Sequence, residues 1–110
     1  MLDCVFCKIA TGDIPSRKSY HENDEIISFL DIDQKIPGHT LVIPAAHHQW
    51  FDEMPEDVSE KLFRASQRIA RELKQKTSAD FIKLAIVGTD VPHVHVHLLP
   101  LFFNDTPPSI

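Results

Sequence analysis

The pattern of apolar and polar positions along the chain predicts four β-strands and two helices. Residues 25–31 (EIISFLD) and 39–44 (HTLVIP) are short, apolar and rich in β-branched residues, and residues 35–38 between them are typical of a turn. These segments predict a hairpin. Residues 81–87 (FIKLAIV) predict a buried strand, and residues 93–99 (HVHVHLL) predict a last strand with strict alternation.

One long amphipathic helix is predicted over residues 55–76. Pro55 suits the first helical position, and the acidic residues after it suit the first turn. One apolar stripe recurs at helical spacing, formed by Val58, Leu62, Ala65, Ile69 and Leu73. A shorter helix is predicted over residues 3–11, ended by residues 12–15 (GDIP). Antiparallel strands with one long and one short helix predict an α+β fold.

Length and charge limit the classes of protein that fit. The 110 residues suit a single domain over residues 1–110, in which the polar, proline-rich residues 103–110 are expected to form a loose tail. The net charge of −5 and the lack of a basic run argue against binding to nucleic acid or to an anionic membrane. No segment approaches the roughly 20 apolar residues of a membrane helix, and Asp3 and Lys8 interrupt the N-terminal apolar segment, so we expect a cytoplasmic protein.

Three histidines alternate with apolar residues between Pro92 and Pro100. In a strand, His93, His95 and His97 share one face. A neutral imidazole is a nucleophile or general base near pH 7, the same nitrogen ligates zinc, and protonated imidazoles stabilise a phosphoryl oxyanion. The plainer alternative is a solvated polar face without chemistry, and the strict alternation of three histidines argues against it.

The Cys4-x-x-Cys7 pair is open to three interpretations: a redox pair, half of a zinc site, or two small buried residues. No βαβ pattern surrounds the pair, which weakens the redox interpretation. A structural disulfide is not expected in a reducing compartment. Two thiolates need two further ligands to complete a tetrahedral zinc site.

The alternating histidine run resembles the signature of the histidine triad (HIT) family of nucleotide-binding proteins. Further segments resemble the same family in the same order along residues 4–101, namely residues 4–9, 12–15, 29–32 and 37–44. The resemblance implies a HIT-like α+β fold with an antiparallel sheet, and a homodimer in which the two sheets join across the interface.

The resemblance also implies a reaction. Family members hydrolyse nucleoside 5′-phosphoramidates or dinucleoside polyphosphates through a covalent nucleotidyl-histidine, and they release a purine nucleoside monophosphate. Carried over to this sequence, His95 is the nucleophile, His97 contacts the phosphate or the leaving group, and His39 completes the cluster. Such a nucleophile needs one unprotonated ring nitrogen, while an acceptor holds the N–H of the other.

Three residues resemble the family's substrate contacts, and two more are candidate contacts in a loop that departs from the family pattern. Asp31 resembles the acid that binds the ribose hydroxyls, and Phe6 and Ile32 resemble the apolar walls of the base pocket. The backbone N–H of Gly88 and the side chain of Thr89 are candidate donors to the phosphate. The plainer alternatives are a solvent-exposed acid for Asp31 and ordinary core for Phe6 and Ile32.

Two departures from the family pattern bear on function. Asp90 takes the position at which many members carry a hydroxyl, and an ionised carboxylate beside a phosphate is repulsive. The family's usual asparagine on the preceding strand is also missing. Both departures favour a rival interpretation, a non-catalytic module that binds nucleotide or zinc. Nucleotidyl transfer is less favoured, because the relatives that perform it are much longer chains.

The resemblance to a zinc-binding bacterial branch implies a complete ligand set: Cys4, Cys7, His47 and His93. His48 is an alternative to its neighbour His47. A site with all four positions filled is structural rather than catalytic, so the expected cofactor is a structural zinc, with no organic cofactor.

Overall fold

The computed structural model describes residues 4–14, 20–21 and 25–104. The elements follow in the order α1 (Val5–Thr11), β1 (Tyr20–His21), β2 (Ile26–Leu30), β3 (Thr40–Pro44), the 3₁₀ helix η1 (Phe51–Glu53), α2 (Glu56–Thr77), β4 (Phe81–Ile86) and β5 (Val96–Leu101). The strands form one antiparallel sheet in the order β1-β2-β3-β5-β4. The α+β fold with one long and one short helix is confirmed.

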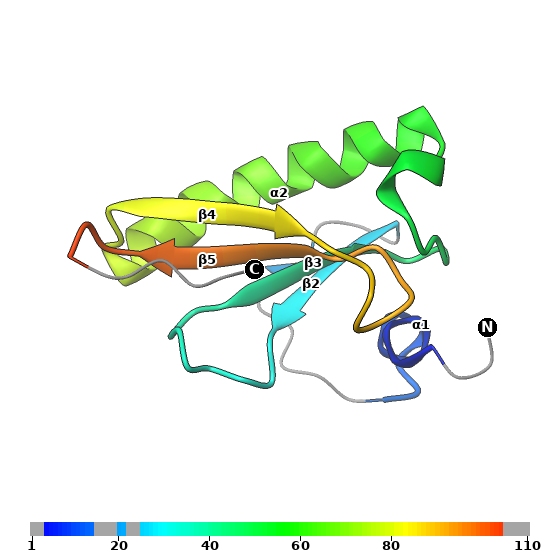
Figure 1. The fold of residues 1–110 in the computed structure, drawn as a ribbon, viewed down its shortest axis with the longest axis horizontal. Helices are drawn as coiled ribbons and strands as arrows, with labels where there is room; N and C mark the ends of the chain where they lie inside the picture. Colours follow the sequence, from blue (N-terminus) through cyan, green and yellow to red (C-terminus); the bar gives the residue numbers. More distant parts are fainter. Residues whose placement is uncertain (1–3, 15–19, 22–24, 105–110) are drawn as a thin grey trace.

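A helix packs against each face of the sheet, which explains why the central strands are buried on both sides. One apolar cluster joins α2 to the alternate strand residues Ile26, Val42, Val96 and Leu98. A second cluster joins α1 to the opposite faces of β2 and β3 through Phe6, Ile9, Ile27, Phe29, Leu41 and Ile43. Figure 1 shows α2 along one side of the sheet and α1 on the other. The sheet therefore separates an α2 face from an α1 face.

The long helix follows its sequence pattern closely. Pro55 is the residue before the first helical residue, and Ser78, with a φ of 59°, ends the helix in a left-handed conformation. Leu62, Ile69 and Leu73 of the predicted stripe are buried. No helix in the described part of the chain combines the length and the apolar character that crossing a membrane requires.

The last strand begins later than predicted. It starts at Val96 rather than at His93, because the backbone N–H groups just before it bond outside the sheet. The His93 N–H donates to the Val91 carbonyl at 2.8 Å, and the Val94 N–H donates to the His48 carbonyl at 2.6 Å. The alternation nevertheless continues through these residues, and all three histidines of the triad are buried.

The prediction of a buried strand over residues 81–87 is wrong in one respect: β4 lies at the edge of the sheet, where β5 alone of the described strands pairs with it, and each of its residues keeps some exposure. The short edge strand β1 was not predicted, since two residues carry no periodic signal. Residues 3 and 15, at the ends of the predicted first helix and its turn, and most of the predicted loose tail (105–110) lie outside the described residues. The tail and the single-domain assignment stay predictions.

Candidate functional site

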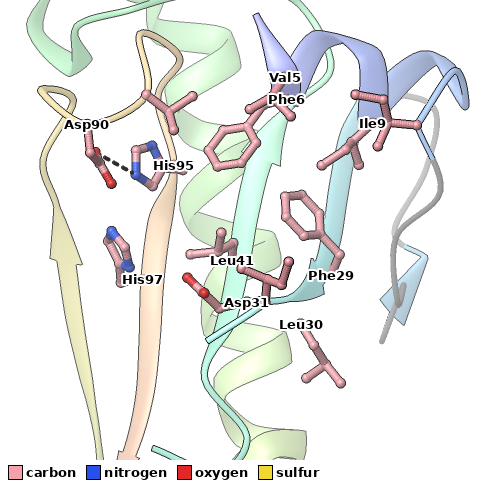
Figure 2. Close-up of a pocket in the computed structure, with 13 residues that line it drawn as sticks. Val5, Phe6, Ile9, Phe29, Leu30, Asp31, Leu41, Asp90, His95 and His97 are labelled. Carbon is pink, nitrogen blue, oxygen red and sulfur yellow. Dashed lines mark ion pairs between the residues drawn. The ribbon is translucent and has the colours of Figure 1, made fainter. Parts of the chain in front are cut away.

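A cavity of about 490 Å³ opens on the α1 face of the sheet. Its walls are mostly apolar and come from α1, β2 and β3, as Figure 2 shows. Four polar side chains interrupt this lining: Asp31, Asp90, His95 and His97. An apolar cavity with a few convergent polar groups is the usual form of a small-molecule site.

His95 presents an unpartnered nitrogen to this cavity. Its Nδ1 lies 2.7 Å from the carbonyl oxygen of His93, and because a carbonyl only accepts, Nδ1 donates and carries the proton. In the neutral ring the lone pair is then on Nε2. That atom is buried and has no hydrogen-bond partner among the described residues. The ring packs edge-on against Phe6, with centroids 5.0 Å apart. These are the features that a histidine nucleophile requires.

The carboxylate of Asp90 lies close to that nitrogen. Its Oδ1 lies 3.4 Å from His95 Nε2, and 63% of its side chain is exposed. Burial raises the pKa of Asp90, but the backbone N–H of Val91 and the neighbouring His95 outweigh this effect, and the net pKa is lower than usual. The carboxyl group is therefore ionised at neutral pH.

A second group of polar side chains lies beside the first. His39 Nε2 and His97 Nδ1 are 2.9 Å apart, and Asp31 Oδ2 is 3.7 Å from His39 Nε2. Burial, together with repulsion from His95 and His39, lowers the pKa of His97 to about 4. Burial also lowers the pKa of His39, although Asp31 opposes the shift. At pH 7 both rings are neutral, so they offer hydrogen bonds rather than positive charge.

The low pKa of His97 predicts acid-sensitive stability. The unfolded histidine titrates near pH 6.5 and the folded one near pH 4. Between these values the unfolded state binds the additional proton, so stability is complete above about pH 6.5 and is lost as pH falls toward 4. At pH 5 the loss due to this group is about 2 kcal/mol. Urea unfolding at pH 7.5 and pH 5 should show that His97→Gln loses less stability than the wild type. Equal losses in the two proteins would contradict the assignment.

The two cysteines meet two histidines at the other end of the triad. Cys4 Sγ lies 3.2 Å from His93 Nδ1, and Cys7 Sγ lies 3.2 Å from His47 Nδ1 and 3.5 Å from His93 Nδ1. All four ligand atoms lie within 4.8 Å of one another. Ligands of a tetrahedral zinc with about 2.3 Å to sulfur and about 2.0 Å to nitrogen are roughly 3.5 Å apart. The spacing therefore fits one zinc ion.

The tautomer of His93 also suits a metal ligand. His93 Nε2 lies 2.8 Å from the carbonyl oxygen of Pro44, so it donates there and leaves Nδ1 free to ligate. Burial lowers the pKa of His93. Burial raises the pKa of Cys7 to about 11, with Cys4 adding to the shift. A metal ion would have to displace the thiol proton, so its binding would weaken as pH falls.

Some of the remaining predicted residues belong to the sulfur cluster or the cavity lining, and others do not. His47 joins the sulfur cluster, whereas its neighbour His48 does not belong to it. Ile32 lines the cavity at its rim and is 97% exposed. Gly88 and Thr89 are not among the residues that line the cavity. Their role at a phosphate stays a prediction.

Several residues that line the cavity have no chemical signature in the sequence: Val5, Ile9, Ile14, Phe29, Leu30, Leu41 and Val91. Most of them had a signal as apolar residues of a predicted helix or strand. That signal does not distinguish a cavity wall from a packed core.

The fold and the site together define a small α+β domain with a histidine cluster beside an apolar cavity. The family model described as HIT domain matches residues 11–104. The chain therefore belongs to the histidine triad family.

Three relatives place the chain within that family. A crystal structure of a Streptococcus mutans protein is 43% identical, with a TM-score of 0.89 over 100% of this chain and 73% of that one. A zinc-bound histidine triad family protein from Mycobacterium smegmatis is 34% identical, with a TM-score of 0.85 over 96% of this chain and 79% of that one. Adenosine 5′-monophosphoramidase of Saccharomyces cerevisiae is 34% identical over 98 residues, which are 88% of this chain and 61% of the yeast protein.

Proposed function

We propose that the protein hydrolyses nucleoside 5′-phosphoramidates and releases a purine nucleoside monophosphate through a covalent intermediate on His95. Membership of the family and the named activity of the yeast relative support nucleotide binding or hydrolysis in general. The observation that carries the finer proposal is the buried, unpartnered Nε2 of His95 at the wall of the cavity. Dinucleoside polyphosphates are the second substrate class.

In the first step His95 Nε2 forms a bond to the α-phosphorus as the phosphorus–nitrogen bond breaks. The leaving nitrogen keeps the electron pair of that bond, takes a proton from solvent and departs as an amine. His95 becomes a phosphorylated imidazolium, and its Nδ1–H stays bonded to the His93 carbonyl at 2.7 Å. This fixed acceptor stabilises the charge that develops on the ring.

In the second step water adds to phosphorus, and the electron pair of the phosphorus–imidazole bond returns to Nε2. The proton lost by the water passes to solvent, and the nucleoside monophosphate leaves. Two displacements thus replace a single more difficult one. The neutral His97 lies next to His95, with ring centroids 4.8 Å apart, and we assign it the hydrogen bond to the phosphate or leaving group. His39 holds His97 in place through the 2.9 Å contact between their rings.

The apolar part of the cavity suits a nucleobase. We assign Phe6 and Ile32 to its walls and Asp31 to the ribose hydroxyls, since all three line the cavity. Asp31 Oδ1 already accepts the N–H of Asp33 at 2.8 Å, which orients the carboxylate. Donation to the phosphate by Gly88 and Thr89 remains a proposal that requires the loop after β4 to approach the cavity.

We further propose that Cys4, Cys7, His47 and His93 hold a structural zinc. Their spacing and the thiol and imidazole donors fit the metal, and the zinc-bound mycobacterial relative supports the assignment. The ion would supply a cross-link rather than a Lewis acid, because all four positions would be filled. It would join α1 to the segment that leads into β5 and would hold the His93 carbonyl in place for His95.

We also propose a cytoplasmic homodimer whose sheets join at β4. This strand lies at the edge of the sheet, and Leu84 on it is 46% exposed. An exposed edge strand with apolar side chains is suited to pairing with a second copy.

The proposed activity is tested by measuring AMP release from adenosine 5′-phosphoramidate, with diadenosine tetraphosphate as the polyphosphate comparison. We expect turnover of the phosphoramidate. AMP binding without turnover of either substrate would favour the rival, a binding module, for which Asp90 beside the nucleophile is the specific argument. Formation of a nucleotidyl sugar when a sugar phosphate is added would favour nucleotidyl transfer.

A further inference from the structure

Three side chains of the cavity converge in an arrangement that hydrolysis does not explain. Asp90, His95 and His97 each contribute an oxygen or nitrogen atom to a group whose members lie within 4.8 Å of one another. Figure 2 shows Asp90 opposite the His95 ring, with His97 beside both. The four ligand atoms of the sulfur cluster are not part of this group.

The contact between Asp90 and His95 joins two acceptors. His95 donates through Nδ1 to the His93 carbonyl, so in the neutral ring Nε2 carries a lone pair. The carboxylate of Asp90 is also an acceptor, and its Oδ1 lies 3.4 Å away. Two acceptors this close repel each other unless a proton or a metal cation lies between them.

The spacing favours a metal ion over a proton. A charge-assisted N–H···O bond is about 2.7–2.9 Å long. The 3.4 Å contact is longer, and Nε2 has no hydrogen-bond partner among the described residues. In a tetrahedral zinc site with bonds of about 2.0–2.2 Å, an oxygen and a nitrogen ligand are roughly 3.4 Å apart. The spacing therefore allows the lone pairs of Asp90 Oδ1 and His95 Nε2 to coordinate one common ion.

His97 completes the set. Its Nδ1 faces His39 Nε2 at 2.9 Å. When Nδ1 donates in that contact, the lone pair of His97 is on Nε2 and is free to ligate. Two imidazoles and one carboxylate are a ligand set that binds zinc and leaves a fourth position open.

We propose that Asp90, His95 and His97 form a second metal site, which takes Zn²⁺ or a similar divalent transition metal at the nucleophile itself. The ion occupies the lone pair that would attack phosphorus, so binding reversibly inhibits the enzyme. The metal site stands on the geometry alone, and only the inhibition rests on the proposed function. Asp90 supplies the one charged ligand, which makes it the decisive residue.

The site is tested by titrating the zinc-loaded protein with Co²⁺ and following its absorption and the metal bound per chain. We expect one further equivalent, with ligand-field bands but no added sulfur-to-cobalt charge-transfer band. Cys7→Ser should keep this equivalent, since it removes a ligand of the sulfur cluster and none of the three ligands of this group. Asp90→Asn should bind it at least about tenfold more weakly, because loss of even an outer partner has that effect. Asp52→Asn, which removes an exposed acid of η1, is the matched control.

Two results would overturn the proposal: no further equivalent in the wild type, or equal affinity in Asp90→Asn and wild type. The contact would then be an imidazolium–carboxylate pair. Added Zn²⁺ should also slow AMP release by the wild type over the same concentration range in which the second site fills. The same Zn²⁺ should slow Asp90→Asn by a smaller factor, measured against the rate of that variant without added Zn²⁺. If no protein releases AMP, the proposed function fails, while the cobalt titration still decides the metal site.

Discussion

The His95→Ala variant is expected to release AMP from adenosine 5′-phosphoramidate at least about 10³-fold more slowly than the wild type. Loss of a nucleophile removes the covalent route altogether, and rate losses of 10³–10⁶ are usual for such residues. The variant should still bind AMP, because Phe6 and Asp31, which we propose contact the base and the ribose, remain in the cavity lining. Steady-state AMP release and equilibrium AMP binding measure the two effects separately.

His48→Ala is the matched control, because it removes a histidine whose side chain belongs neither to the cavity lining nor to the sulfur cluster. It should retain the wild-type rate. Rapid quenching of the wild type during turnover should also yield a protein heavier by one adenylyl group, which His95→Ala cannot form. Normal turnover by His95→Ala would show that another residue is the nucleophile.

Periodicity predicted the fold because the sheet is packed on both faces. The segments predicted over 25–31 and 39–44 contain β2 and β3, whose apolar side chains face α1 and α2 alternately, and the register pairs Leu41 with His97 on the α1 face. The long helix could be predicted equally well, since one apolar stripe packs on the sheet and the remaining helix surface is mostly polar. These features depend on side-chain spacing, which the sequence displays directly.

Backbone contacts were not predictable in the same way. The tautomers of His93 and His95 depend on the carbonyls of Pro44 and His93, and the late start of β5 depends on the carbonyl of His48. Every residue carries a carbonyl group, so no residue type indicates which one will be close. The alternation of histidines predicts a shared face but not the atoms that each ring meets.

Electrostatic properties of the site also required the structure. The pKa of His97, about 4, results mainly from burial and from the neighbouring His95 and His39. His39 lies in the connection between β2 and β3, far from His97 in the sequence. The sequence identified Asp90 as a departure from the family pattern, but not that its carboxylate faces His95 Nε2. Spatial neighbours, rather than neighbours in sequence, determine both properties.

Removal of the proposed zinc is expected to lower the stability of the protein strongly. A ligand that binds only the folded state stabilises it by about 4 kcal/mol when its free concentration is a thousandfold above Kd. For a chain of this size the loss corresponds to a fall in Tm of roughly 15 °C or more. Thermal unfolding with and without a strong chelator measures it, and bound zinc is counted in the same samples.

The position of the sulfur cluster explains why the effect should be large and should reach the active site. Cys4 and Cys7 lie at the start of α1, whereas His93 lies two residues before His95, the proposed nucleophile. Without chelator, Cys7→Ser should therefore already have the low Tm that the wild type shows with chelator. Adding chelator should not lower the Tm of this variant further. His48→Ala should keep the full response. If the chelator leaves the Tm of the wild type unchanged while zinc is absent from the protein, the cysteines are free thiols, and α1 is held by the packing of Phe6 and Ile9 alone.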